Sequence, residues 1–174
     1  MAGTDTQSES RERLLDWLRD AHAMEKQASQ MLSTMESRIE HYPDLRRRIA
    51  QHIKETETQA TRLEDCIKTL GGSTSSVKDA TGTIMGLIHT LPSALSGDEV
   101  MKGALAGYTF EHFEIASYRI LIAAATTLGE TTVAETCRKN LREEEEMAQW
   151  LSSNIDQLTA HYLEREDKGQ TAKR

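Results

Sequence analysis

Aromatic residues, proline and glycine are scarce in this chain of 174 residues. It contains eight aromatic residues (two Phe, two Trp and four Tyr), two prolines and ten glycines. Sandwiches and barrels need many turns and many aromatic or β-branched strand residues, so this composition argues against both. Alanine, leucine, methionine, glutamate, glutamine, lysine and arginine dominate instead, and these residues favour helices. Since the length suits one domain with one core, we expect a single all-α domain.

Cysteine is almost absent, and so are long hydrophobic runs. Cys66 and Cys137 are too few and too far apart for a disulfide framework or a cysteine-rich zinc site. We expect both to be reduced thiols in the core, with a disulfide or a redox role as the alternative. No stretch approaches the roughly 18–20 apolar residues that span a bilayer, and the amino terminus has no signal-peptide pattern. These features predict a soluble, cytoplasmic protein.

Positive charge is in the minority. The chain carries 28 acidic and 21 basic side chains, which gives a net charge of −7. A nucleic-acid binder needs a basic face that replaces the counterions of the phosphates, and an anionic membrane repels an acidic surface. The charge therefore predicts neither a nucleic-acid partner nor a membrane partner.

Apolar residues recur at helical spacing in four long segments. The predicted helices cover about residues 10–40, 43–70, 97–128 and 132–163. Pro43 suits the first turn of the second helix, and Gly71 is placed to end it. The first two helices are joined by a short connection, and so are the last two. Each pair is therefore expected to form an antiparallel hairpin.

The starts of the last two helices and the segment between the hairpins have their own patterns. Ser96 with Glu99, and Thr132 with Glu135, have the spacing of capping boxes. The segment between the hairpins, which begins at Gly71, is rich in glycine, serine and threonine around a short apolar piece at 84–91. We expect a long crossover that contains a short fifth helix. One long crossover is typical of the ferritin-like four-helix bundle.

These patterns define the expected domain organisation. We predict a ferritin-like antiparallel bundle over residues 10–163, a flexible amino terminus at 1–9 and a frayed carboxyl-terminal tail at 164–174.

Each of the four predicted helices carries glutamate on or beside its apolar stripe. The candidates are Glu25 in the first helix, Glu55 in the second, Glu111 and Glu114 in the third, and Glu144 in the fourth. Glu111 and Glu114 are three residues apart, so they are neighbours on one helix face. All five acids lie near the middle of their helices. A bundle would therefore bring them to a common depth.

Buried carboxylates that face one another need a cation between them. Burying an unpaired carboxylate costs on the order of several kcal/mol of free energy, unless the group takes up a proton. A divalent ion or a dinuclear centre removes that cost, and carboxylate oxygens supported by imidazole suit iron and manganese. The alternative is that the apolar face of each helix is assigned with an error of one residue, so that the glutamates face the solvent.

Neighbouring residues have more than one interpretation. Glu143, Glu145 and Glu146 belong to a run of four glutamates that circles its helix, so we expect them to be mostly solvated. His52 precedes Glu55 by three residues and is a metal ligand, a partner that orients a ligand, or a core histidine. Tyr118 lies one turn from Glu114, where it either bonds a ligand carboxylate or packs in the core.

At these residues the chain resembles the YciE/YciF-like family of bacterial stress proteins, which is similar in fold to rubrerythrin. The matching segments are DAHAMEKQA around Glu25, HIKETETQATRLEDCIKTLG around Glu55, FEHFEIASYRILIAAATTLGE around Glu111, and LREEEEMAQWL around Glu144. The resemblance covers residues 10–163. It implies a helical homodimer with a di-iron-type pocket and a role in stress response.

The resemblance also implies a ligand set and a chemistry. Carried over position by position, Glu25, Glu55, Glu111, Glu114 and Glu144 match the carboxylate ligands of the rubrerythrin-like pattern, and we add His52 as a candidate. The chain lacks the Glu-x-x-His pairs of that pattern and has alanine four residues after its last ligand position, which predicts a weaker or asymmetric site.

Two functions are compatible with this site. If it holds iron or another divalent metal, the expected chemistry is ferroxidase-like or peroxidase-like, with dioxygen or peroxide as the oxidant. The alternative is a non-catalytic, stress-protective homodimer that retains the carboxylates as a hydrogen-bonded polar core.

Overall fold

Four long helices make up most of the molecule. The computed structural model describes residues 3–74 and 97–172, with side chains from residue 8 onward. The helices are α1 (Gly3–Arg38), α2 (Pro43–Thr69), α4 (Glu99–Thr127) and α5 (Thr131–Asp167). No strand occurs in the described parts of the chain, and the predicted all-α fold is confirmed. The short fifth helix expected at 84–91 lies outside the described residues.

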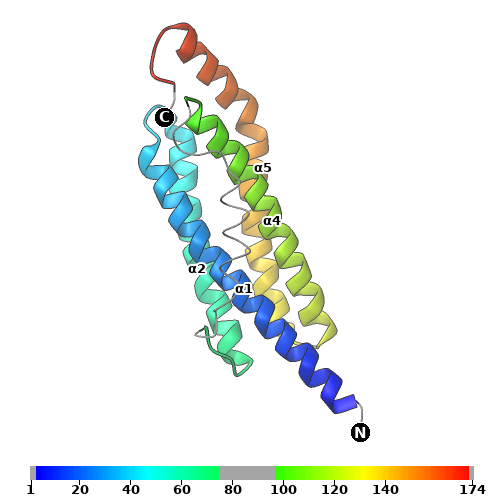
Figure 1. Cartoon of the computed structure of the whole chain (residues 1–174). Coiled ribbons are helices and arrows are strands. Elements are labelled where there is room, and N and C mark those ends of the chain that lie inside the picture. The colour runs from blue at the N-terminus through cyan, green and yellow to red at the C-terminus, as the bar shows by residue number, and fades with distance from the viewer. Residues whose placement is uncertain (1–2, 75–96, 173–174) are drawn as a thin grey trace.

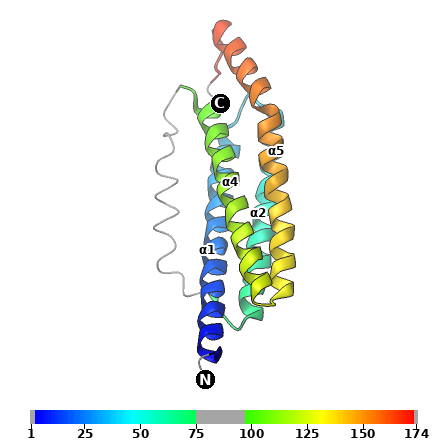
Figure 2. The same cartoon turned by 90° about the vertical axis from the view of Figure 1, so that its right-hand side faces the viewer.

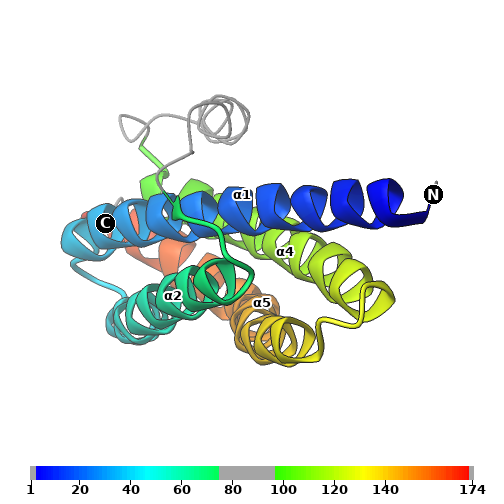
Figure 3. The same ribbon diagram turned by 90° about the horizontal axis from the view of Figure 1, so that it is seen from below.

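The helices form two antiparallel hairpins that pack side by side. α1 pairs with α2, and α4 pairs with α5 (Figure 1). Across the two hairpins, α1 packs on α4 and α2 packs on α5, so the helices surround one centre (Figure 3). α2 ends at one end of the bundle and α4 begins at the other (Figure 2). The order and directions of these four helices match the ferritin-like arrangement.

Proline and glycine mark the helix boundaries. Pro43 occupies the first turn of α2, where its missing N–H costs no hydrogen bond. Gly71 follows α2 with φ +81°, a left-handed conformation that glycine adopts without a Cβ clash. The N–H groups of Gly71 and Gly72 then donate to the carbonyls of Lys68 and Ile67, both at 2.9 Å. This Schellman motif ends α2 where the sequence predicts.

The starts of α4 and α5 differ from the predicted capping boxes. α4 begins after Asp98 and α5 begins after Glu130, and neither of these residues makes a side-chain capping bond. Thr132 already lies inside α5, because the tight turn at Gly129 brings the chain directly from α4 into α5. Ser96 lies outside the described residues. The spacing of residues was correct for a helix start nearby but wrong for the cap.

Both ends of the chain are more regular than the sequence predicts. α1 begins at Gly3, so most of the segment expected to be flexible at 1–9 is helical. α5 continues to Asp167, and the chain after it folds back along the bundle. Tyr42 donates its hydroxyl hydrogen bond to the carbonyl of Ala172 at 2.7 Å, and Ala172 is buried. The tail is therefore packed as far as Ala172 and is not frayed.

Two apolar clusters fill the two ends of the bundle. One includes Leu14, Leu18, Leu63 and Leu121, and the other includes Ile49, Met147 and Leu151. Each helix contributes to both clusters. No described helix is both long and apolar enough to cross a membrane. Cys66 and Cys137 are buried free thiols within the first cluster, as expected from the sequence.

Candidate metal centre

A layer of buried polar side chains separates the two apolar clusters. Its members are Glu25, His52, Thr56, Gln59, Glu111, Glu114, Asn140 and Glu144, and none is more than 1 % exposed. All four helices contribute, because each has polar residues at helical spacing where its apolar stripe is interrupted. Polar groups at such depth cost free energy unless they find partners.

Four of these residues form a compact group. His52, Glu111, Glu114 and Glu144 each place one nitrogen or oxygen atom within 4.8 Å of the others. Nε2 of His52 lies 3.3 Å from Oε2 of Glu111 and 3.4 Å from Oε2 of Glu144. The structure thus brings one imidazole from α2, two carboxylates from α4 and one from α5 into one small volume.

Glu55 lies beside this group and orients His52. Its Oε2 is 2.9 Å from Nδ1 of His52 and accepts a hydrogen bond from Arg48 at 3.0 Å. Its Oε1 accepts from Gln51 at 2.7 Å. Both oxygens are therefore engaged, and the other ring nitrogen of His52 faces the carboxylates. This is the arrangement in which a carboxylate fixes the orientation of a metal-binding histidine.

Glu25 is the member of the layer that α1 contributes. Tyr118 donates a hydrogen bond from its hydroxyl to Oε1 of Glu25, and both side chains are fully buried. Glu25 is close enough to Glu144, His52 and Glu111 for their charges to affect its pKa, although it is not one of the four grouped residues. The structure shows both interpretations of Tyr118: its ring packs in the first apolar cluster, and its hydroxyl donates a hydrogen bond to a candidate ligand.

Burial shifts the pKa values of the acids upward. Desolvation, followed by repulsion from Glu144, raises the pKa of Glu25 and of Glu114 well above the usual value. Desolvation also raises the pKa of Glu111, to about 7, although hydrogen bonding to His52 opposes it. Without a cation, Glu25 and Glu114 favour their protonated forms, and Glu111 favours its protonated form below about pH 7.

The pKa of His52 is raised, although burial of an imidazole by itself lowers its pKa. Burial alone would lower the pKa of His52, but hydrogen bonds to Glu111, Glu144 and Glu55 outweigh it and raise the pKa well above its usual value. For Glu55, the hydrogen bonds from His52, Gln51 and Arg48 outweigh partial burial and lower the pKa to about 2. Imidazolium therefore supplies the positive charge of the metal-free layer.

Several oxygens of the layer have no hydrogen-bond partner. Among them are Oε2 of Glu25, Oε1 of Glu114 and Oε1 of Glu144, whereas Oε2 of Glu111 and Oε2 of Glu144 share the single Nε2–H group of His52, at 3.3 and 3.4 Å. Unpaired buried carboxylate oxygens are rare in folded proteins. Hard oxygen donors with one imidazole are the ligand set that suits ferrous iron or manganese, so the residues present fit such an ion.

The sequence pointed to most of this layer but not to all of its members. Asn140 is fully buried four residues before Glu144, and that spacing on the α5 stripe is the signal that could have singled it out. Glu143 differs from the expectation of a solvated residue: it is about one-fifth exposed and accepts a hydrogen bond from Arg62 at 2.6 Å. Glu145 and Glu146 are exposed as expected.

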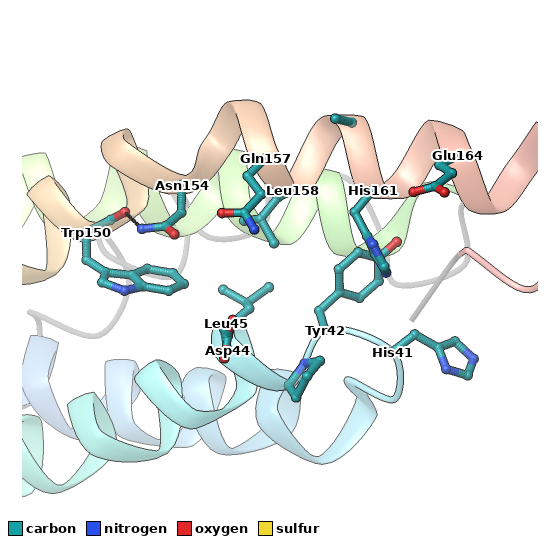
Figure 4. Close-up of a pocket in the computed structure, with 12 residues that line it drawn as sticks. His41, Tyr42, Asp44, Leu45, Trp150, Asn154, Gln157, Leu158, His161 and Glu164 are labelled. Atoms are coloured by element: carbon teal, nitrogen blue, oxygen red, sulfur yellow. Dashed lines mark hydrogen bonds between the residues drawn. The ribbon is translucent and has the colours of Figure 1, made fainter.

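A separate surface cleft lies near the junction of α1 and α2. It has a volume of about 420 Å³ and is lined by Tyr42, Leu45, Trp150, Leu158 and His161, among others (Figure 4). The rings of Tyr42 and His161 meet edge to face with their centroids 5.3 Å apart. Among the described residues, no buried polar atom without a partner belongs to its lining. The unpaired oxygens that call for a ligand lie in the central layer instead.

The fold and the central layer define an all-α bundle of the ferritin-like class with a buried histidine–glutamate cluster that could hold a metal ion. A family model described as a domain of unknown function (DUF892) matches residues 9–164. The chain belongs to this family, and the resemblance to YciF-like proteins is confirmed.

Solved structures agree with this assignment. A protein from Xanthomonas campestris is 46 % identical, with a TM-score of 0.76 over 91 % of this chain and 99 % of that one. YcfI from Rhodopseudomonas palustris is 27 % identical, with a TM-score of 0.67 over 82 % and 92 %. The Escherichia coli stress protein YciF is 22 % identical and supports the fold alone, with a TM-score of 0.68 over 84 % and 94 %.

Proposed function

We propose that this protein binds iron, or another divalent metal, in the central polar layer and oxidises ferrous ions with dioxygen or peroxide as part of a stress response. The observation that carries the proposal is the set of buried carboxylate oxygens around His52 that have no hydrogen-bond partner or share its single Nε2–H group. A cation would pair with these oxygens and would remove the repulsion that raises the pKa values of Glu25 and Glu114. The proposed role in stress response follows from the resemblance to YciF-like stress proteins.

The residues of the layer have distinct roles in this proposal. Glu111, Glu114 and Glu144 hold the ferrous substrate together with Nε2 of His52, which Glu55 keeps oriented. Bound ferrous iron supplies the electrons that reduce the oxidant. With side chains at most 1 % exposed, the layer excludes bulk water from the reacting ions. Glu111, whose pKa is about 7, and Nε2 of the His52 imidazolium both release a proton when a cation binds.

Anaerobic titration tests the proposal directly. We expect purified, metal-free protein to bind ferrous iron at about one or two ions per chain and to raise its melting temperature, because a ligand that binds only the folded state stabilises it. Admission of air should then change the absorbance as the iron is oxidised. No binding and an unchanged melting temperature would exclude the proposed function. Metal analysis of the protein as isolated identifies the ion.

Two variants separate ligands from orienting residues. Glu111→Ala removes a candidate ligand and should abolish binding of the ion. Glu55→Gln keeps the size of the side chain but removes the charge that orients His52, and we expect metal affinity to fall about tenfold, as for other orienting partners. Loss of binding as complete in Glu55→Gln as in Glu111→Ala would show instead that Glu55 is itself a ligand.

The second candidate function is a non-catalytic, stress-protective protein with a polar core. It is favoured by His52, whose imidazolium already pairs with Glu55, Glu111 and Glu144. In that case Glu111→Ala removes one partner of a buried ion pair and should lower the stability of the protein, and ferrous iron should leave the melting temperatures of both wild type and variant unchanged. Metal binding in contrast predicts that ferrous iron raises the melting temperature of the wild type but not that of Glu111→Ala.

The expected homodimer and the cytoplasmic location remain proposals. For the dimer, α4 gives support: its outward-facing side chains include Leu105, Phe113 and Ile120, which are 59 %, 36 % and 54 % exposed. α4 has only five charged residues, and two of them, Glu111 and Glu114, are buried in the central layer. A second copy of the chain would cover such an apolar face.

A further inference from the structure

A chain of hydrogen bonds connects one residue from each of the four helices. Arg62 on α2 donates from Nη1 to Oδ1 of Asn140 on α5 at 2.9 Å. Asn140 donates from Nδ2 to the hydroxyl of Tyr118 on α4 at 3.0 Å. Tyr118 donates in turn to Oε1 of Glu25 on α1. Asn140, Tyr118 and Glu25 are fully buried, whereas the Arg62 side chain is 20 % exposed, so the chain of bonds leads from the surface to the polar layer.

The chemistry of each group fixes the direction of these bonds. A guanidinium is donor-only, so the Asn140 oxygen has to face Arg62 and the amide nitrogen has to face Tyr118. The Tyr118 oxygen accepts that bond, and its single proton is then free to point at Glu25. Arg62 is itself anchored, because Glu143 accepts from its Nη1 at 2.6 Å and also from Gln59 at 3.1 Å. Each donor therefore sets the orientation of the next.

Glu25, at the end of this chain of hydrogen bonds, has one carboxylate oxygen without a partner. Tyr118 occupies Oε1 of Glu25, while Oε2 is buried without any partner. Repulsion from Glu25 contributes to the raised pKa of Glu114, so the two carboxylates lie near each other in the layer. A carboxylate with one oxygen fixed by a donor and the other unpaired is prepared to bind a cation.

We propose that Arg62, Asn140 and Tyr118 are positioning residues that hold Glu25 as an additional metal-binding arm. The inference rests on the proposed metal binding and extends it, because it assigns roles to three residues outside the candidate ligand set. It also predicts that a change at the half-buried Arg62 alters affinity at the buried site. Substitutions along the chain of bonds should therefore weaken metal binding without removing any ligand.

The first arm of the test uses metal-free protein labelled on its four tyrosines, with the NMR signal of Tyr118 assigned through Tyr118→Phe. Asn140→Asp keeps the shape but can only accept hydrogen bonds when ionised, so it should take the Tyr118 proton away from Glu25 and shift that signal alone. The matched control is Asn154→Asp, since Asn154 lies on the same helix and bonds the Trp150 carbonyl. An unshifted Tyr118 signal in Asn140→Asp would overturn the chain of bonds.

A second pair of variants covers the case in which Asn140→Asp fails to fold. Arg62→Met removes the donor at the surface end and should shift the Tyr118 signal, whereas Arg62→Lys keeps a donor-only cation and should restore the wild-type signal. A role in packing alone predicts no difference between the two Arg62 variants. Equal Tyr118 signals in both variants would contradict the inference.

The second arm measures Mn²⁺ affinity by calorimetry. Asn140→Asp and Arg62→Met should bind Mn²⁺ about 10- to 100-fold more weakly than wild type, as is typical when an orienting partner is lost, and Asn154→Asp should match wild type. Wild-type affinity in Asn140→Asp and Arg62→Met would overturn the positioning role while the proposed function stands. A wild-type protein that binds no Mn²⁺ or Fe²⁺ would instead overturn the proposed function, and the positioning role with it.

Discussion

At the scale of single residues, Glu111 makes the metal-free fold sensitive to pH. Burial raises its pKa from 4.5 to about 7. An acid that holds its proton more tightly in the folded state than in the unfolded state stabilises the fold at low pH, and this advantage is lost as the pH rises from about 4.5 through about 7. We expect metal-free protein to lose on the order of 1–3 kcal/mol of unfolding free energy across that window from Glu111.

Glu111→Gln isolates this contribution. Glutamine keeps the size of the side chain but cannot ionise, so the variant should lose less stability than wild type between about pH 4.5 and 7, and should be the more stable protein above that window. Urea unfolding of metal-free protein at several pH values measures the difference. The exposed residue Glu145 provides the control substitution, Glu145→Gln. Parallel pH curves for Glu111→Gln and wild type would contradict the assigned pKa shift.

At the scale of helices, the sequence predicted the elements better than their ends. The ends of α2 follow from Pro43 and Gly71, because proline and left-handed glycine act through backbone geometry that is local in sequence. The capping box at Thr132 is wrong because such spacing is short and common, and because the turn at Gly129 starts α5 before Thr132. The return of the tail depends on Tyr42 and Ala172, which are far apart in sequence, so no local pattern could reveal it.

The role of Gly129 can be measured at this scale. Gly129 has φ +75°, and apart from its two chain neighbours no described residue has an atom within 4 Å of the position that an alanine Cβ would take there. Gly129→Ala should therefore cost about 1 kcal/mol through backbone strain alone. Gly97→Ala is the matched control, because Gly97 is equally open and does not have a positive φ. Thermal or urea unfolding compares the two variants. A loss of stability that is equal in both would show that left-handed geometry is not the cause.

At the scale of the whole molecule, the sequence predicts the depth of the polar layer but not the hydrogen bonds and ion pairs within it. Glutamates at mid-helix in four helices are visible from periodicity, and the topology then brings them to one level. Which acid faces the centre and which orients a neighbour depends on partners from several turns or helices. Glu55 is held aside by Arg48 and Gln51, and Asn140 is placed by Arg62 from another helix. The orientations of these side chains are therefore determined by tertiary contacts, which the local sequence does not show.

The outer face of α4 carries the last prediction, the homodimer. Leu105 and Ile120 are each more than half exposed, and burying them against a second chain is favourable by about 25 cal/mol per Å² of apolar surface. Sedimentation equilibrium should therefore give twice the chain mass of 19.5 kDa for wild type.

The variant Leu105→Glu/Ile120→Glu tests which face is used. Two charges on this face would be desolvated without partners in a dimer, so the variant should sediment as a monomer with unchanged helix content. Leu163→Glu is the control, because Leu163 is 53 % exposed but belongs to α5. If the α4 variant remains dimeric while Leu163→Glu dissociates, the contact between copies is made by α5 instead. A monomeric wild type would contradict the dimer altogether.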